Sequence, residues 1–128
     1  MNASRNLALL AGRILIAALF IYDAYLMVTG WDGTVAYMEK FGLPGALLPL
    51  VAGCQFIGGV AIVLGFQTRL AALAFAVYCL STALVFHHDL GNGGETIQAG
   101  KDLAIAGGFL FLAATGAGAW SLDRRARP

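Results

Sequence analysis

Residues 46–66 read ALLPLVAGCQFIGGVAIVLGF, and no side chain in this stretch is charged. A helix of about 20 apolar residues spans the ~30 Å hydrocarbon core of a bilayer. Backbone groups in lipid must form their hydrogen bonds within the segment, which favours a helix over a single strand. The stretch therefore predicts a transmembrane helix, around which the rest of the sequence can be interpreted.

Three more apolar segments of similar length lie at 7–29, 70–87 and 102–120. Hydrophobic residues make up 59% of the 128 residues and charged residues only 12%, with a mean hydropathy of +0.78. A soluble domain has roughly 25% charged residues, so too few are present to cover a water-facing surface. The sequence predicts an all-α integral membrane four-helix bundle, one domain over 1–128, whose small residues, such as Gly58 and Gly59, allow close packing.

The segments that connect the apolar stretches predict a short interfacial helix and the orientation of the chain in the membrane. Residues 34–41 are expected to form a short interfacial helix with Met38 facing lipid. The side that carries both termini has six arginines, whereas the long loops on the other side carry only Lys40 and Lys101. Basic residues favour the cytoplasmic side, so both termini are predicted to be cytoplasmic. Asp123, with the arginines after it, is interpreted as part of a solvated tail.

Polar residues inside lipid are costly and mark candidate functional positions. Here they concentrate in the outer half of the bundle, which predicts a polar cavity that opens outward. Asp23 is the most informative, because a buried carboxylate needs a partner or a proton. It is a proton-handling or ligand-contacting group, or half of a structural ion pair with Lys101 or a protonated His87, or an aspartate shallow enough to reach interfacial water. The candidate ligand-binding residues of this cavity are Asp23, Tyr22, Tyr25, Gln55, His87, His88, Lys101 and Asp102.

Several of these residues also have structural interpretations. His87 and His88 suit a metal only with further ligands, because neighbouring helix residues point about 100° apart. Lys101 and Asp102 are expected at the start of the fourth helix, where Asp102 would be the N-cap. The sequence contains no nucleophile motif and no basic stripe for nucleic acid, so neither covalent catalysis nor nucleic-acid binding is predicted.

Short motifs along the whole chain resemble those of the DoxX family of small bacterial membrane proteins. They are Gly12-Arg13-Ile14-Leu15, Gly42-Leu43-Pro44, Gly58-Gly59, the stretch 64–69 (LGFQTR), Phe86-His87, 101–108 (KDLAIAGG) and 115–123 (TGAGAWSLD). The resemblance implies a four-helix protein of the bacterial inner membrane, with several passes through the bilayer. Some relatives are subunits of thiosulfate:quinone oxidoreductase, and others are linked to redox homeostasis. Relatives commonly carry Ser-Gly and then a lysine where this chain reads Tyr22-Asp23-Ala24-Tyr25-Leu26, a glutamate at the position of Gln55, and Lys-Asn in place of Lys101-Asp102.

Three functions follow as hypotheses. The first is a non-catalytic, accessory subunit of a redox or respiratory assembly, associated with other membrane subunits or with itself. The second is a quinone-linked oxidoreductase component whose periplasm-facing site contains Asp23, Gln55 and His87. The third is a small transporter or metal-handling protein. The residues alone identify no cofactor: a quinone head or a haem contacted by one histidine stays open beside a metal ion.

Overall fold

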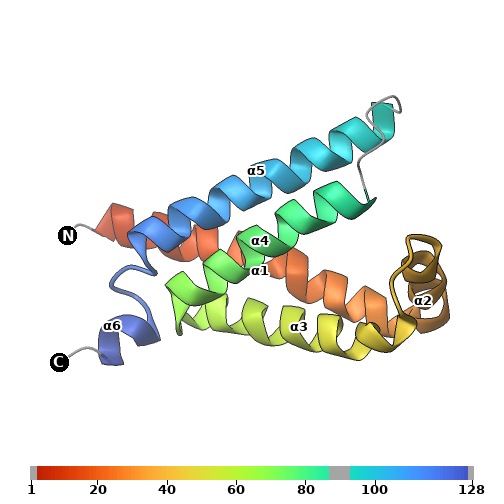
Figure 1. Cartoon of the computed structure of the whole chain (residues 1–128). Helices are drawn as coiled ribbons and strands as arrows, with labels where there is room; N and C mark the ends of the chain where they lie inside the picture. The colour runs from red at the N-terminus through yellow and green to blue at the C-terminus, as the bar shows by residue number, and fades with distance from the viewer. Residues whose placement is uncertain (1–2, 87–92, 127–128) are drawn as a thin grey trace.

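The computed structural model describes residues 3–86 and 93–126, and all regular structure within them is helical (Figure 1). Four helices, α1, α3 together with η1, α4 and α5, are long and apolar enough to cross a membrane. This confirms the predicted all-α membrane architecture. In chain order the elements are α1 (Ala3–Thr29), α2 (Trp31–Lys40), the 3-10 turn η1 (Gly45–Leu47), α3 (Leu48–Leu64), α4 (Thr68–Phe86), α5 (Gly93–Thr115) and α6 (Leu122–Ala126).

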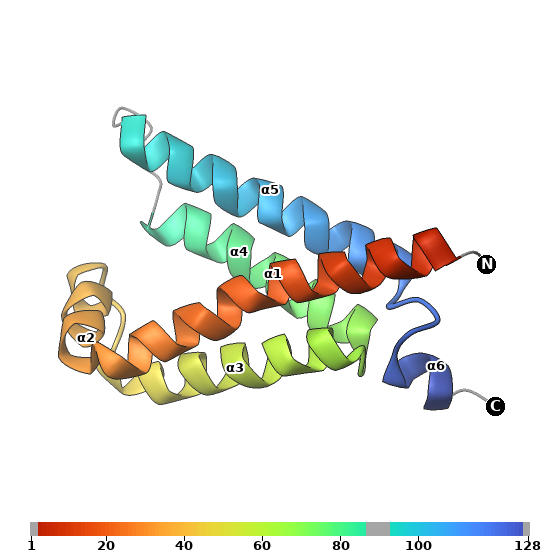
Figure 2. The same ribbon diagram turned by 180° about the vertical axis from the view of Figure 1, so that it is seen from behind.

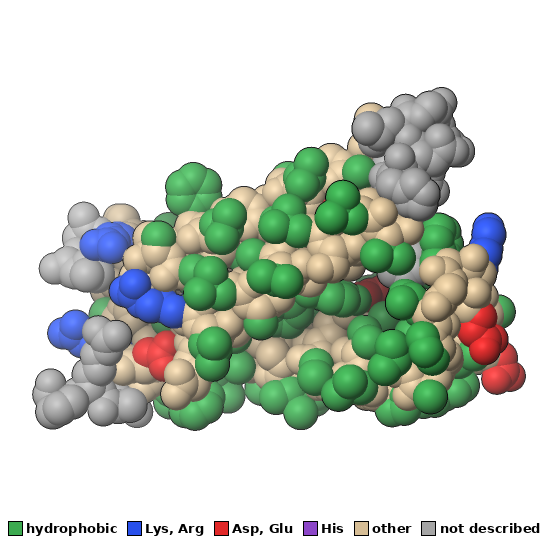
Figure 3. Space-filling model, in the orientation of Figure 1, with side chains coloured by type: hydrophobic (Ala, Val, Ile, Leu, Met, Phe, Trp, Pro, Cys, Tyr) green, Lys and Arg blue, Asp and Glu red, His purple; other side chains and the backbone are tan. Residues whose placement is uncertain are grey.

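The long helices are arranged as two pairs. Helix α1 packs along α3, α4 packs along α5, and α3 contacts α4 to join the pairs. Figures 1 and 2 show the pairs diverging toward α2, while the start of α1 and α6 lie together at the opposite end. We call these the α2 end and the terminal end. Figure 3 shows basic side chains gathered at the terminal end, whereas acidic ones predominate at the α2 end.

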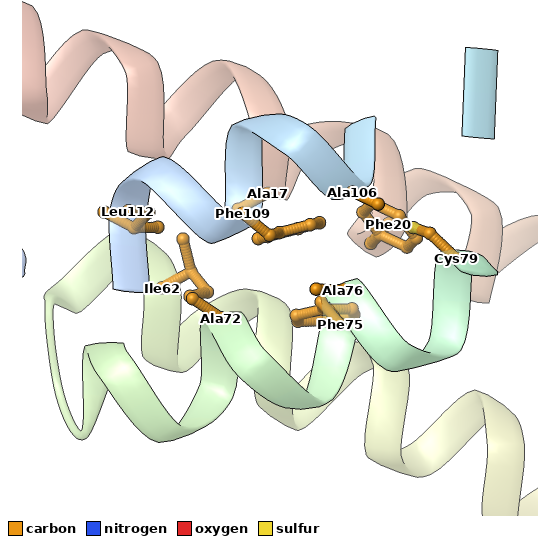
Figure 4. Close-up of a cluster of buried hydrophobic side chains, with 10 residues drawn as sticks. All are labelled: Ala17, Phe20, Ile62, Ala72, Phe75, Ala76, Cys79, Ala106, Phe109 and Leu112. Atoms are coloured by element: carbon orange, nitrogen blue, oxygen red, sulfur yellow. The ribbon is translucent and has the colours of Figure 1, made fainter. Parts of the chain in front are cut away.

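The main core lies where the two pairs meet (Figure 4). The rings of Phe75 and Phe109 stack with their centroids 4.9 Å apart, and Phe20 lies against both. Four of the ten buried residues in this cluster are alanines, namely Ala17, Ala72, Ala76 and Ala106. Such small side chains let helices approach closely, where dispersion drives their association in lipid. The predicted small-residue packing is therefore present.

Two helix ends depend on glycine. Gly65 ends α3 with a φ of +73°, and the N–H of Phe66 donates to the carbonyl of Ala61 at 2.8 Å. Gly116 and Gly118 have φ values of +76° and +90°, which ends α5 at Thr115 rather than at the predicted position 120. The apolar run continues past Thr115, so the prediction from hydropathy extended the helix too far.

Helix α2 differs from the predicted interfacial helix in extent and in orientation. It begins at Trp31 and ends at Lys40, rather than covering 34–41. Met38 is only 6% exposed and packs against Leu48 and Ala52, so the prediction that it faces lipid is wrong. The chain turns at Gly30 and folds α2 back onto the start of α3, which offers Met38 a protein surface.

Candidate functional site

A polar pair joins α1 to α3. Gln55 is 3% exposed, and its Nε2 donates to Oδ2 of Asp23 at 2.8 Å and to the carbonyl of Phe20 at 2.9 Å. Because both partners accept hydrogen bonds, the orientation of the amide is determined. Oε1 of Gln55 is buried and accepts no hydrogen bond from the described residues. Asp23 and Gln55, two of the positions at which the sequence departs from the pattern it resembles, are therefore in direct contact.

A cavity of about 410 Å³ lies beside this pair, between α1, α2 and α4. The surface in Figure 3 is hollowed between α4 and the α2 end, with an acidic side chain inside the hollow. Thr34 and Thr82 lie in the wall of the cavity. The hydroxyl of Thr34 donates to the carbonyl of Gly30, and that of Thr82 donates to the carbonyl of Tyr78. The lining comprises Asp23, Leu26, Met27, Gly30, Gly33, Thr34, Tyr37, Met38, Tyr78 and Thr82.

Sequence reasoning missed four polar residues of this cavity, Thr34 and Tyr37 on α2 and Tyr78 and Thr82 on α4. Tyr78 and Thr82 lie within the segment 70–87, which has no charge before its final histidine. Tyr78 also lines a second, apolar groove of about 250 Å³ between α3 and α4, together with Gln55. The signal that could have identified the two residues of α4 is the presence of hydroxyl groups inside an otherwise apolar span.

The other candidates lie elsewhere. Tyr22 and Tyr25 are exposed on α1, where their rings stack on each other with centroids 6.3 Å apart, and they do not line the cavity. Lys101 is exposed and Asp102 is partly buried, both on α5. His87 and His88 lie outside the described residues. The structure thus brings Asp23 and Gln55 together and places the two tyrosines on the surface.

Asp102 was expected at the start of a helix, and the structure contradicts this prediction. Helix α5 begins at Gly93, so Lys101 and Asp102 lie within it and Asp102 cannot be its N-cap. The segment before Lys101 is rich in glycine and polar residues, a composition that favours a loop. Its polar side chains, such as Thr96 and Gln98, are instead carried by the first turns of α5.

The described residues contain no group of three His, Cys, Asp or Glu side chains that could hold a metal ion. Cys54 is exposed on α3, Cys79 is buried on α4, and both thiols are free. The metal hypothesis depended on His87 and His88, which are not described. Among the residues that the structure describes, the site around Asp23 contains no metal-ligand set.

The polar residues of the terminal end hold helix ends together. Arg13 is 1% exposed, and its guanidinium donates to the carbonyls of Ile62 and Val63 at 3.4 and 3.2 Å and of Trp120 at 2.6 Å. These contacts cap the C-terminus of α3, where a positive charge is favourable. Arg69 likewise donates to the carbonyl of Ala114 at 3.1 Å, near the end of α5.

Asp123 caps the start of a helix, so its interpretation as part of a solvated tail is wrong. Its two carboxylate oxygens accept from the N–H groups of Gln67 and Thr68 at 2.8 and 2.9 Å, and its own N–H donates to the carbonyl of Gly65 at 2.8 Å. A carboxylate at this position caps the N-terminus of α4. The sequence could not indicate this, because the cap lies 55 residues away from Thr68.

Replacing Asp123 by alanine is expected to lower the free energy of unfolding by about 1 kcal/mol, the usual loss for a helix cap. Thermal unfolding in a mild detergent, followed by helical circular dichroism, measures the change. Asp123→Asn keeps one acceptor and should lose less. Glu39→Ala, on the exposed face of α2, is the control. Equal midpoints for Asp123→Ala and the control would contradict the capping role.

Comparison with known proteins agrees with this architecture. The DoxX family profile matches residues 8–88. Inner membrane protein YqjF of Escherichia coli (strain K12) is 45% identical over 97% of this chain and 95% of its own length. Inner membrane protein YphA of the same strain is 39% identical, over 97% and 94%. A protein of Bacillus subtilis (strain 168) named "Putative oxidoreductase CatD" is 29% identical over 60% and 58%. No solved structure matches the chain significantly.

Proposed function

This chain belongs to the DoxX family, and from this premise we propose that it is a membrane component of a redox assembly that holds the polar head of a quinone beside Asp23 and Gln55. The chain is a multi-pass inner-membrane protein. The observation that carries the proposal is the hydrogen bond between Gln55 and Asp23, two polar groups within membrane-spanning helices, beside a cavity of about 410 Å³. The relative named as an oxidoreductase supports the redox assignment.

The residues present fit a quinone head. A volume of about 410 Å³ falls within the range of roughly 300–1,000 Å³ of small-molecule sites. Asp23 can accept a hydrogen bond from the hydroxyl of a reduced ring, and the phenol of Tyr78 can donate one to the carbonyl of an oxidised ring. The apolar lining, which includes Leu26 and Met38, suits the remainder of the ring.

A bound quinone would supply two-electron, two-proton carrier chemistry. The contribution of the chain would be to bind and orient the head and to hold a proton. Gln55 holds Asp23 through Oδ2, and Asp23 also lines the cavity. A carboxyl group next to a partly dehydrated cavity is suited to accept or release the proton that accompanies electron transfer.

The orientation in the membrane is part of the proposal. Arg5, Arg13, Arg69 and Arg124 all lie in the elements that meet at the terminal end. The bias of basic residues toward the cytoplasm then puts both termini there. The cavity lies toward the α2 end and would open on the periplasmic side, so it would take up the carrier from the outer half of the bilayer.

An accessory role without a ligand is the second candidate. No more than 33% of any span is buried inside the chain, so each long helix has faces that contact lipid or other subunits. Such faces would let the chain support a larger complex even if the cavity has no function. The two candidates differ in whether a carrier is bound.

Purification from bacterial membranes in a mild detergent separates them, with native mass measurement and organic extraction of the same sample. The proposed function predicts quinone in the extract, at a ratio approaching one per chain after lipid is accounted for. A chain that migrates with redox subunits and carries no quinone supports the accessory role and overturns the quinone site. Extraction of an unrelated inner-membrane protein of similar size, purified in parallel, gives the background of free quinone.

A further inference from the structure

The groove between α3 and α4 lies at the depth of the hydrocarbon core. Its wall on α3 includes Leu50, Cys54 and Gly58, and its wall on α4 includes Ala74, all within the membrane-spanning helices. Apart from Gln55 and Tyr78, its lining is apolar or small. A groove of this kind, about 250 Å³ in volume and placed between two spans, is in contact with lipid tails rather than with water.

The groove leads to the polar pair. Gln55 lines it while donating to Asp23, and Tyr78 lines both the groove and the larger cavity beside Asp23. An amphipathic molecule could therefore place an alkyl or isoprenoid tail between α3 and α4 and its head among these three side chains. A water-soluble ligand would gain nothing from the apolar walls.

The polar side chains of Gln55 and Asp23 also discriminate between the head groups of possible ligands. Both N–H groups of the Gln55 amide are used, by the carbonyl of Phe20 and by Asp23. What remains at this pair is acceptor capacity, namely the buried Oε1 of Gln55 and the carboxyl oxygens of Asp23, whereas Tyr78 adds a single phenol donor. A buried acceptor without a donor is unfavourable by about 1–3 kcal/mol, and a ligand hydroxyl would relieve this.

We propose that the groove between α3 and α4 is the route by which a lipid-soluble ligand reaches the site from the bilayer, and that Gln55 and Asp23 select a ligand whose head carries hydroxyl donors. For the site proposed above, on which this inference rests, the preferred ligand is the reduced quinol rather than the quinone. The preference follows because Gln55 and Asp23 offer acceptors and only Tyr78 offers a donor, while an oxidised quinone ring carries acceptors alone.

Photolabelling tests the route. The probe is a fully substituted benzoquinol with a decyl tail that carries a diazirine, applied under anaerobic conditions to the full chain in lipid vesicles. The expected adducts lie on residues 50–58 and 71–78. Ala74→Phe, which narrows the groove from the exposed side of α4, should reduce labelling about tenfold. Val77→Phe is the matched control, because Val77 is exposed on the same helix and does not line the groove.

Competition with unlabelled molecules tests the selectivity. The decyl-tailed quinol should displace the probe at a concentration about tenfold lower than the matching quinone, and Gln55→Leu should abolish this difference. Equal displacement by quinone in the native chain would overturn the selectivity. Displaceable adducts confined to α1 and α2 would overturn the route and leave the proposed quinone site intact. If no adduct is displaced anywhere, the proposed quinone site itself is wrong.

Discussion

Replacing Arg13 by methionine is expected to lower the free energy of unfolding by about 3 kcal/mol or more. Methionine keeps much of the apolar stem but removes the donor to the carbonyls of Val63 and Trp120, at a position that is 1% exposed. Hydrogen bonds from a charged group contribute about 1.5–3 kcal/mol each, and unpaired buried carbonyls add to the loss. The effect is large because one side chain connects α1, the end of α3 and the segment before α6.

Chemical or thermal unfolding in detergent, followed by helical circular dichroism, measures this loss. Arg5→Met is the matched control, since Arg5 is an exposed arginine on the same helix and should change stability little. Arg13→Lys should be intermediate, because an ammonium cannot reach several carbonyls with the planar geometry of a guanidinium. If Arg13→Met unfolds at the same midpoint as Arg5→Met, then Arg13 is only a positive charge at the membrane surface.

Replacing Gly65 by alanine is expected to destabilise the protein by about 2 kcal/mol or more. A φ of +73° is unfavourable by about 1–2 kcal/mol for a residue with a Cβ, and the added atom would also collide with Ser121 and with the guanidinium of Arg13. The backbone of Ser121 lies 3.1 Å from the position of that Cβ, so side-chain rotation alone cannot relieve the contact. The substitution would push the segment before α6 away from the end of α3.

Gly53→Ala provides the control for this experiment. Gly53 lies in the middle of α3, and no atom is within 4 Å of the Cβ that alanine would add there. Replacing a glycine inside a helix by alanine normally stabilises the helix by up to about 1 kcal/mol. The two variants should therefore change stability in opposite directions, as measured by the same unfolding experiment. A neutral Gly65→Ala would show that the end of α3 can rearrange without loss.

The membrane-spanning architecture could be predicted because it depends on local composition. Each span is an apolar run long enough for a bilayer, and lipid leaves a helix as the conformation that satisfies the backbone. Asp23 and Gln55 could be proposed as a site for a related reason, since polar side chains stand out in an apolar run. Their contact could not be predicted, because it depends on how α1 packs against α3.

What the sequence did not indicate are the interactions between distant segments. The carbonyls that Arg13 binds lie 49 to 107 residues away, and Asp123 caps a helix that begins 55 residues earlier. In the sequence both residues resemble ordinary charges near a membrane surface. The break after Thr115 was also missed, because glycines in an apolar run suit both a packed helix and a helix end.

The proposed function requires that the Asp23–Gln55 pair binds the head of a quinone-type carrier. Its most direct test is a binding titration of a decyl-tailed benzoquinol with the native chain and with Asp23→Leu, in the same detergent and without oxygen. A saturable site with one ligand per chain is predicted, and its affinity should fall at least about tenfold in the variant, since a hydrogen bond to a charged group is worth about 1.5–3 kcal/mol. Identical titration curves for the two proteins, or no saturable binding to either, would contradict the account.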